Sequence, residues 1–237
     1  FEEWKKTQKV PEDVSYVKLI VPLELTGGIS IRKYSTRPEE ADYEQLTCND
    51  VPVIPGSSWC GAIRAGARSI LEELLDKDVA AEYIDEWFGR VKTAGAGIKD
   101  AWQSKVVVAE SVIEGGNSMV VTRNKINRFD ASTKRGALYT ERSHFGGTTR
   151  LELVVKKDTE GEYKSMCGLL QLIAGEIGRG ELPIGGLVSV GRGIFCENGT
   201  LRYEGAEQEE VSEWNKALAK KVRELSAVGK EEREAEQ

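Results

Sequence analysis

Cysteine and histidine are scarce in this chain, which has four cysteines and one histidine among 237 residues. The cysteines, Cys48, Cys60, Cys167 and Cys196, stand far apart and form no C-x-x-C pair. Zinc sites need clustered Cys and His ligands, and disulfide frameworks need many closely spaced cysteines. We therefore expect no zinc and reduced, cytosolic thiols.

Long hydrophobic runs are also lacking. No apolar stretch approaches the roughly 20 residues needed to cross a bilayer, and no secretory signal pattern opens the chain. Hydrophobic residues nevertheless make up 40% of the sequence, which is enough for a core in one domain with insertions or in two small ones. We expect a soluble protein with no membrane partner. The first residue is Phe1, so both a free subunit and a module of a longer chain stay open.

An excess of positive charge is absent, since the net charge is −6. This balance argues against indiscriminate RNA binding. Binding depends on local charge, however, and the acids concentrate at 39–44, at 72–86 and in the C-terminal tail. One local basic groove therefore remains compatible with the composition.

The stretch 51–75, VPVIPGSSWCGAIRAGARSILEELL, predicts an extended approach, a turn and a helix. Ser57 or Ser58 is the expected N-cap, because a serine hydroxyl can accept a hydrogen bond from a free amide of the first turn. Apolar residues recur at steps of three and four and predict one buried stripe: Ile63, Ala67, Ile70, Leu71 and Leu74.

Arg64 and Arg68 fall on a second, polar stripe of the same helix. A helix N-terminus carries free amides and partial positive charge, so it favours an anion, and the two arginines extend that preference. The pattern is consistent with a seat for a phosphate backbone. It is equally the pattern of an ordinary capped helix with solvated arginines.

The densest basic run begins inside the expected strand at 119–128 and continues beyond it. Strand alternation places Arg123 and Lys125 on one face, opposite Val120 and Ile126. The segment after Phe129 is expected to be irregular, either as a hairpin lying over an RNA strand or as a solvated loop. The candidate RNA contacts of the whole basic run are Arg123, Lys125, Arg128, Lys134 and Arg135.

A glycine-rich loop, GGLVSVGRG, occupies 185–193. Gly185, Gly186 and Gly191 permit backbone geometries closed to other residues and let a nucleic acid approach the main-chain amides, with Arg192 beside them. The alternative is a tight turn packed against the first helix.

The expected elements follow the order of the α+β, ferredoxin-like (RRM-like) β-α-β-β-α-β core, with helices on one face of the sheet. An RNP-type aromatic signature is missing, so base stacking on this sheet is not the expected mode. We expect a single domain over 1–237 with an acidic loop at 29–50, a mobile loop at 90–103, a basic hairpin at 117–147 and a C-terminal helix at 208–228. The remaining expected elements are strands at 14–26, 105–113, 148–157 and 194–197, helices at 79–88 and 164–178, and a hairpin turn at Asn198-Gly199 into 200–203. The strand at 14–26 is expected to place five apolar residues on one face, and the helix at 164–178 to bury five: Val17, Leu19, Val21, Leu23 and Leu25 in the strand, and Met166, Leu169, Leu170, Ile173 and Ile177 in the helix.

Three motifs in the expected order resemble the RAMP superfamily of RNA-binding proteins in CRISPR effector complexes. They are IPGSS and GAIR at 54–64, RNKINRFDASTKRGALYTE at 123–141, and the glycine loop at 185–193. The resemblance covers about two-thirds of the chain. It implies a guide-RNA-binding backbone subunit of a type III antiviral effector, cytoplasmic in a prokaryote, with guide CRISPR RNA, complementary target RNA and other RAMP subunits as partners.

The resemblance also implies a possible endonuclease activity. Type III backbone subunits use one Asp of the acidic loop for metal-dependent cleavage of target RNA, with a divalent ion such as Mg²⁺. Counting back along the chain from the Pro-Gly-Ser-Ser turn at 55–58, Asp42 or Glu40 lies closest to that position. Asp42 is the candidate cleaving carboxylate. The chain departs from the family at Cys60, where a Lys is common, and at Asn127, where Asp is frequent.

Other interpretations stay open. Surface acids that are merely solvated would fit a non-cleaving capping RAMP subunit of the same complex. The negative net charge would fit a protein-only ferredoxin-like scaffold. A guide-processing nuclease would need an acid or base such as His144, the one histidine.

Overall fold

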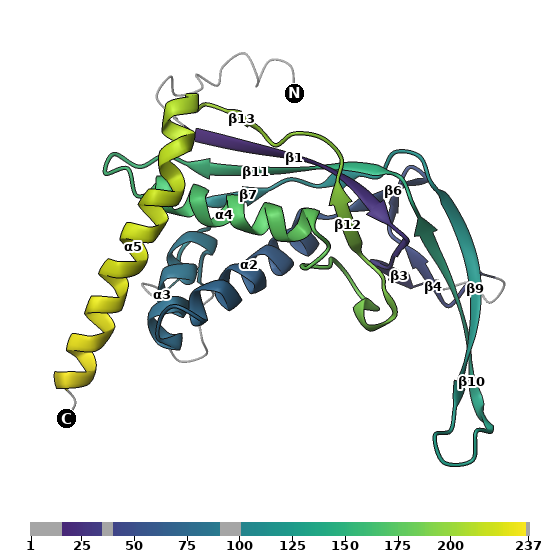
Figure 1. The fold of residues 1–237 in the computed structure, drawn as a ribbon. Helices are drawn as coiled ribbons and strands as arrows, with labels where there is room; N and C mark the ends of the chain where they lie inside the picture. The colour runs from purple at the N-terminus through teal and green to yellow at the C-terminus, as the bar shows by residue number, and fades with distance from the viewer. Residues whose placement is uncertain (1–15, 35–39, 91–100, 236–237) are drawn as a thin grey trace.

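The computed structural model describes residues 16–34, 40–90 and 101–235, and it shows a mixed α+β fold. Helices pack against one face of a central antiparallel sheet, and a long β-hairpin extends away from the body (Figure 1). The central sheet has the order β12-β1-β11-β7, with β13 also paired to β1. Its strands are β1 (Tyr16–Thr26), β7 (Val106–Val108), β11 (Thr148–Lys156), β12 (Ile194–Glu197) and β13 (Arg202–Glu204).

The central strand β1 follows the alternation of its sequence. Its odd-numbered apolar residues, Val17, Leu19, Val21, Leu23 and Leu25, are all buried, as predicted. Pro22 sits in the middle of this strand without disrupting it. On one side of β1, β12 pairs with residues from Leu23 onward and β13 pairs with residues up to Ile20. Pro22 lies in the gap between these two partners, so the amide hydrogen that proline lacks is not needed for a hydrogen bond on that side.

The helices bury their apolar faces against this sheet. Every residue of the predicted stripe on α4, from Met166 to Ile177, is fully buried, and α5 packs on α4 through Trp214. The helix bounds are α2 Gly56–Glu72, α3 Lys77–Phe88, α4 Tyr163–Gly178 and α5 Gln208–Ala235. The C-terminal helix thus begins where the sequence predicts and extends beyond 228.

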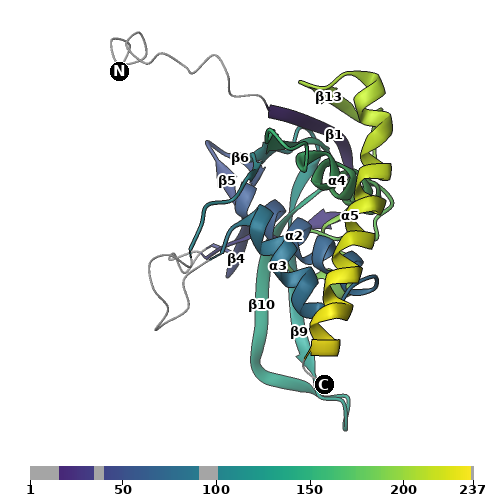
Figure 2. The same cartoon turned by 90° about the vertical axis from the view of Figure 1, so that its left-hand side faces the viewer.

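A second sheet carries the projecting hairpin. It has the order β2-β10-β4-β3, with β9 paired to β10, and β10 crosses from the body into the hairpin (Figure 1). A third, small sheet, β5-β6-β8, lies on the side of the molecule away from α5 (Figure 2). The bounds are β2 Gly28–Ile29, β3 Arg32–Tyr34, β4 Tyr43–Gln45, β9 Asn117–Ile126 and β10 Thr133–Phe145, then β5 Thr47–Cys48, β6 Val51–Ile54 and β8 Ser111–Val112.

The helix α2 begins earlier than the sequence predicts. Its N-cap is Pro55, and both Ser57 and Ser58 lie inside the first turn, where no side-chain hydrogen bond within the described ranges caps the helix. The serine N-cap prediction was therefore wrong. Leu74 was also misplaced in the buried stripe, because the helix ends at Glu72 and Leu74 is 58% exposed.

Several predicted strand boundaries were wrong as well. The strand expected at 105–113 is split between β7 and β8, which belong to different sheets. Within the described strands, β12 and β13 pair with β1 and not with each other, so Asn198-Gly199 is not a hairpin turn. The described parts of 29–50 form short strands. The segment after Phe129, expected to be irregular, is the long strand β10. It shows no apolar alternation because its outer part is mostly exposed and its buried positions near the body are polar, namely Glu141, Ser143 and His144.

Most of the predicted mobile loop at 90–103, namely 91–100, lies outside the described residues. The same holds for 35–39 of the predicted acidic loop, which include Glu39. All four cysteines are free thiols. Among the helices of the described ranges, none has the length and apolarity to cross a bilayer.

Candidate functional site

The glycine loop packs its two ends against the start of the second sheet. Gly185 has φ +90° and lies so close to Ser30 that an added Cβ would be 3.0 Å from the Ser30 carbonyl oxygen. At the other end Gly193 has φ +71°, and a Cβ there would be 1.8 Å from the carbonyl oxygen of Ile184. Only glycine fits both positions. The tip between them, a short 3-10 turn at Val188–Val190, is exposed.

Arg192 joins the glycine loop to the hairpin. Its Nη2 donates a 2.9 Å hydrogen bond to Glu141 Oε1 on β10, and its guanidinium lies 4.3 Å from the ring centroid of Phe145. Arg123 of β9 reaches the same Glu141 oxygen at 3.3 Å. The Arg192 side chain is only 5% exposed. Arg192 thus holds loop and hairpin together through a buried carboxylate, whereas Arg123 remains partly exposed.

The hairpin has two distinct faces. Arg123 pairs directly with Tyr139 across β9 and β10, and strand alternation places Lys125 on the same face as Arg123, as predicted. At its tip Phe129 is 96% exposed. The predicted contacts Arg128 and Lys134 are exposed near this tip, and the side chain of Arg135 is outside the described set.

The arginines of α2 have acidic partners. Arg64 Nη2 lies 2.5 Å from Asp85 Oδ1 of α3, and Arg68 Nε lies 2.6 Å from Glu72 Oε1 one turn along the same helix. Ser57 is exposed and Ser58 is half-buried. A phosphate at this helix would therefore meet two guanidiniums whose charge is already balanced by carboxylates.

The first turn of α2 nevertheless lies close to the glycine loop. Trp59 is fully buried, its ring centroid is 5.4 Å from that of Phe195, and Phe195 follows the loop on β12. The indole Nε1 of Trp59 also donates a 2.7 Å hydrogen bond to Ser111 Oγ. Three segments far apart in sequence are thus connected, because Trp59 contacts the strand after the loop and Arg192 contacts the hairpin.

Cys60 stands in the same turn, where the resemblance would place a lysine. Burial raises the pKa of its half-buried thiol, an effect that the nearby Arg64 partly offsets. The thiol therefore stays neutral near pH 7 and contributes no charge to an anion site.

Asp42, the predicted cleaving carboxylate, is exposed at the start of β4 and bonded to the hairpin. Its Oδ2 accepts a 2.7 Å hydrogen bond from the backbone amide of Thr140, and the Thr140 hydroxyl lies 3.3 Å from the same oxygen. The described residues contain no cluster of three His, Cys, Asp or Glu side chains able to hold a metal ion. A Mg²⁺ held by one protein carboxylate together with RNA phosphate oxygens and water is still compatible with Asp42.

Sequence reasoning missed that three tyrosines meet on the face that carries Arg123. Tyr34, Tyr43 and Tyr139 come from β3, β4 and β10 and touch edge to face, with ring centroids 5.4 and 6.3 Å apart. The guanidinium of Arg32 lies 4.6 Å from the Tyr43 centroid. The only local signal was that strand alternation in Arg32-Lys33-Tyr34 places Arg32 and Tyr34 on one face. The cluster itself is assembled by pairing of β3, β4 and β10, which lie far apart in the sequence.

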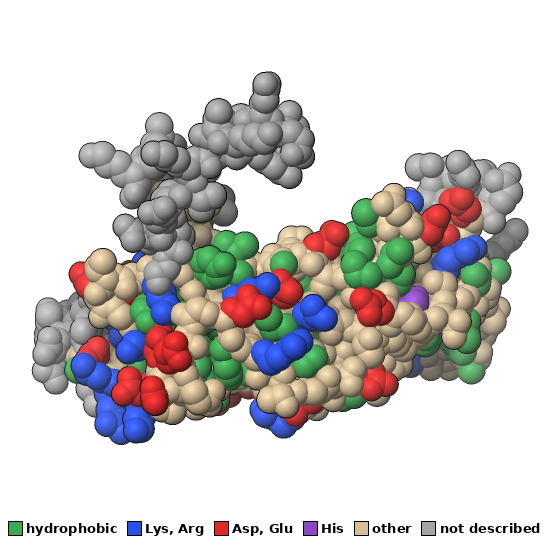
Figure 3. All heavy atoms as spheres, turned by 90° about the horizontal axis from the view of Figure 1, so that it is seen from above, with side chains coloured by type: hydrophobic (Ala, Val, Ile, Leu, Met, Phe, Trp, Pro, Cys, Tyr) green, Lys and Arg blue, Asp and Glu red, His purple; other side chains and the backbone are tan. Residues whose placement is uncertain are grey.

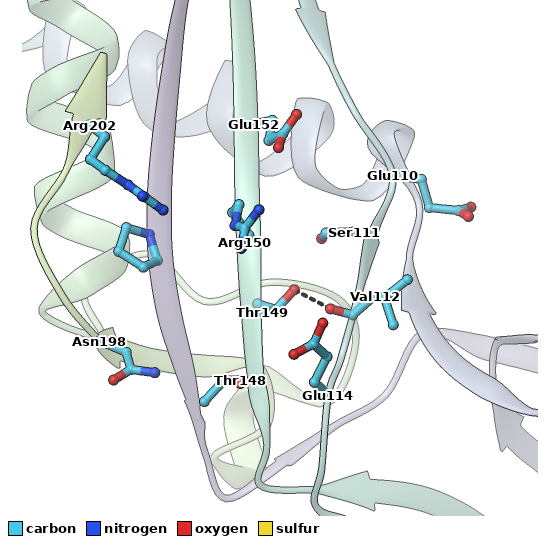
Figure 4. Close-up of a pocket in the computed structure, with 11 residues that line it drawn as sticks. Glu110, Ser111, Val112, Glu114, Thr148, Thr149, Arg150, Glu152, Asn198 and Arg202 are labelled. Carbon is cyan, nitrogen blue, oxygen red and sulfur yellow. Dashed lines mark hydrogen bonds between the residues drawn. The ribbon is translucent and has the colours of Figure 1, made fainter. Parts of the chain in front are cut away.

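The helix-free face of the central sheet offers a weaker candidate. Seen from above, its basic and acidic side chains are intermixed (Figure 3), and Lys18 pairs with Glu152 at 2.8 Å. A pocket of about 390 Å³ on this face has both Arg150 and Arg202 in its lining, but also three glutamates (Figure 4). The mixture provides no net attraction for phosphate.

Comparisons with known proteins place this geometry in a family context. The family model for the RAMP superfamily matches residues 18–196. A search of curated proteins finds no match. Among solved structures, the cryo-EM structure of the Type III-B Cmr-beta bound to cognate target RNA contains a similar chain. It has a TM-score of 0.53 and 16% identity, over 86% of this chain and 66% of that chain.

A chain from the Type III-B Cmr-beta apo state is also similar, with a TM-score of 0.51 and 13% identity, over 78% of this chain and 96% of that one. At these identities the two structures show a shared fold. The chain spans slightly less than two-thirds of the chain in the RNA-bound structure.

Proposed function

Because the chain belongs to the RAMP superfamily, we propose that it is a CRISPR RNA-binding subunit, or module, of a type III antiviral effector complex. In this role it binds guide RNA and positions complementary target RNA. Its other partners are neighbouring RAMP subunits. Fold similarity to chains of a type III-B complex, one of them bound to target RNA, supports the assignment.

The observation that carries the proposal is the contact between Arg192 and Glu141. It fixes the glycine loop against a hairpin that carries the partly exposed Arg123 and the exposed Lys125. Two segments selected from the sequence as separate RNA contacts therefore border one surface. A strand of RNA bound along this surface would meet the exposed tip of the loop at one end and basic side chains along the hairpin.

We assign the principal phosphate contacts to the hairpin residues Lys125, Arg128 and Lys134, together with Arg123. The glycines Gly185, Gly186 and Gly191 set the shape of the loop, because the Gly186 amide already donates to the Ser30 carbonyl and the Gly191 amide to the Val188 carbonyl. Ser57, Ser58, Arg64 and Arg68 make a secondary contribution, because both arginines must exchange a carboxylate for a phosphate. Arg192 acts by positioning the loop.

We propose further that the core is ferredoxin-like. The strand order β12-β1-β11-β7, all antiparallel, with α2 and α3 between β1 and β7 and α4 between β11 and β12, supports this arrangement. The chain is then one RAMP domain over 1–237, and the segment 29–50, the loop 90–103 and the hairpin 117–147 are its insertions.

A salt titration tests RNA binding. Affinity for a labelled single-stranded RNA should fall with salt, and each lost phosphate contact should reduce the slope of log K against log[salt] by about 0.7. We expect the double variant Lys125→Gln/Lys134→Gln to lower both affinity and slope. The matched control Lys216→Gln/Lys220→Gln removes the same charge from α5 and should lower them much less.

Failure of the wild-type protein to bind RNA, or binding independent of salt, would overturn the proposal in favour of a protein-only scaffold. Equal losses of affinity and salt slope in the two double variants would mean that RNA binding depends on the overall charge of the protein and not on the hairpin. Recovery of a short RNA with a uniform repeat-derived 5′ sequence from the purified native complex would identify guide RNA as the ligand.

Cleavage of the target is the second part of the proposal. Asp42 would hold a divalent ion such as Mg²⁺ through one carboxylate, and the ion would supply Lewis-acid stabilisation. The ribose 2′-hydroxyl would lose its proton and bond to the adjacent phosphorus, and the bond to the 5′-oxygen of the next nucleotide would break to leave a cyclic phosphate and a 5′-hydroxyl. In the assembled complex, Asp42→Asn should abolish metal-dependent cleavage of target RNA and leave binding intact. The control Asp50→Asn changes a second acid of the same segment, and its positive φ of 63° suits Asn.

A specific observation favours a second candidate, a non-cleaving capping subunit of the same complex. The Asp42 carboxylate accepts a hydrogen bond from the Thr140 amide of β10, and this structural role by itself gives the side chain a purpose. Cleavage at the wild-type rate by the Asp42→Asn complex would remove Asp42 from catalysis. Binding of guide and target without any metal-dependent cleavage would establish the capping role.

A further inference from the structure

The three tyrosines of the second sheet form a connected row that ends in solvent. Tyr34 on β3 is 69% exposed, while Tyr43 and Tyr139 are half-buried behind it. Tyr34 meets Tyr43 with an interplanar angle of 70°, and Tyr43 meets Tyr139 at 72°. Edge-to-face contacts of this kind fix the orientation of each ring.

The strand that carries Tyr43 is held at both ends. At its start the backbone amide of Thr140 donates to Asp42. At its end Gln45 is buried, its Nε2 donates a 2.9 Å hydrogen bond to the Val53 carbonyl, and its Oε1 accepts from the Ile31 amide at 2.8 Å. The row of rings is therefore presented on a backbone that is fixed before any ligand arrives.

Positive charge surrounds the row on the same face. Arg32 stacks over the Tyr43 ring, and Arg123 lies across the ladder from Tyr139. The acid on this part of the face, Glu141, is 1% exposed and already contacts both Arg192 and Arg123. Among the residues that the structure describes on this face, the accessible charge beside the tyrosines is thus basic.

An exposed aromatic ring next to basic side chains suits a nucleotide better than an apolar protein surface. A base can stack on the ring while the arginines contact the flanking phosphates. Binding to the tyrosine rings also costs little conformational entropy, since the orientation of the rings is already fixed. A protein partner that buried Tyr34 would have to desolvate or pair Arg32 as well.

We propose that Tyr34, held by Tyr43 and Tyr139, stacks an unpaired RNA base and that Arg32 contacts the adjacent backbone. The site rests on the proposed RNA-binding function and assigns it a subsite for a single-stranded nucleotide. Because every base has a π-face, the subsite is tolerant of base identity and selective for unpaired over paired RNA.

The test compares Tyr34→Leu with Tyr34→Phe in the full chain. Phe keeps the aromatic ring, whereas Leu keeps apolar bulk without it. We expect Tyr34→Leu to weaken binding of single-stranded RNA by about five- to one-hundred-fold, as for the loss of one stacked base, with no change in salt slope. Tyr34→Phe should bind like wild type. Tyr16→Leu, at another exposed tyrosine on β1, should also bind like wild type.

A second measurement locates the stacked base. An oligonucleotide scanned with single abasic sites should lose affinity at one position in the wild-type protein, and Tyr34→Leu should show no loss at that position. A fluorescent 2-aminopurine at the same position should be quenched on binding wild type and Tyr34→Phe but not Tyr34→Leu.

The outcomes separate the two proposals. If wild type fails to bind RNA, the RNA-binding function itself is wrong. If wild type binds with a normal salt slope and Tyr34→Leu binds equally well, the stacking subsite is wrong and the function stands. If Tyr34→Leu leaves RNA affinity unchanged but weakens association between copies of this chain, the row of tyrosines is a protein contact and the subsite is likewise overturned.

Discussion

Arg192 and Glu141 form an ion pair across 51 residues of sequence, with 2.9 Å between Nη2 and Oε1 and side chains only 5% and 2% exposed. The pair fixes the glycine loop to the second sheet at the base of the hairpin. Gly28 permits this approach, because a Cβ there would lie 1.9 Å from Arg192 Nη1. The loop and the hairpin are therefore expected to be stable only together.

Breaking this buried pair should be costly. We expect Glu141→Gln to reduce the free energy of unfolding by about 3–5 kcal/mol, since it leaves the buried Arg192 guanidinium without its carboxylate. Arg192→Met should cost less, because Glu141 keeps its 3.3 Å contact with Arg123. The double variant should lose less than the sum of the single losses. Urea denaturation measures all three, and single-variant losses below about 1 kcal/mol would contradict a structural role for the pair.

Two glycines should respond to alanine in opposite directions. Gly193→Ala should destabilise the protein by more than about 2 kcal/mol, because φ is +71° and the new Cβ would overlap the Ile184 carbonyl. Gly61→Ala, in the exposed face of α2, meets no described heavy atom within 4 Å. It should stabilise the helix by up to about 1 kcal/mol. Thermal unfolding distinguishes the two, and a stable Gly193→Ala protein would contradict the loop geometry.

Releasing Arg64 from its partner should strengthen RNA binding. Asp85→Asn removes the carboxylate that lies 2.5 Å from Arg64 and leaves the guanidinium available to phosphate. We expect an affinity increase of a few-fold at low salt that disappears at high salt. Asp78→Asn, at the start of the same helix α3, gives the same change in net charge. Equal affinity gains in both variants would mean that Arg64 has no direct part in binding.

Stability should decline at alkaline pH partly because of Cys167. Burial raises the pKa of this thiol from 9.0 to about 12, so the unfolded chain loses its thiol proton at lower pH than the folded protein. The contribution of the neutral, buried thiol to the free energy of unfolding is fully present below about pH 9. It is lost as pH rises toward 12, by about 1.4 kcal/mol per pH unit.

Comparison with Cys167→Ala isolates this contribution. The difference in unfolding free energy between wild type and variant should shrink by about 1 kcal/mol from pH 8 to pH 10. Burial also raises the pKa of Tyr83 and Tyr163, but these groups are present in both proteins and cancel. A difference that stays constant with pH would contradict the assignment. Native alkylation at pH 8 should modify exposed Cys48 and spare Cys167.

Local pattern predicted the parts of the fold that bury one continuous apolar face. The alternation from Val17 to Leu25 and the stripe from Met166 to Ile177 are confirmed, because burial selects the same residues that periodicity marks. Pattern failed for the hairpin, where a strand is exposed along its outer part and buries polar side chains, Glu141, Ser143 and His144, near the body. The strand β10 was expected to be irregular, and its order comes from pairing with β9, β4 and β2.

The sequence also indicated the family through three short motifs, and the family model agrees over residues 18–196. It could not assign roles within those motifs. Arg192 and Arg123 look alike in sequence, yet the former is buried against Glu141 and the latter is partly exposed. Arg64 and Arg68 similarly looked available, while their acidic partners could be identified only from helix packing and side-chain geometry.

The sequence by itself determined the mixed α+β class, the buried strand and helix faces and the family, since each depends on residues close together in the chain. Only the tertiary structure decided which basic groups stay accessible and which aromatic rings meet. Charge pairing and ring stacking depend on distances of a few ångströms between segments such as Tyr34 and Tyr139. Those distances are set by long-range strand pairing, which no local pattern encodes.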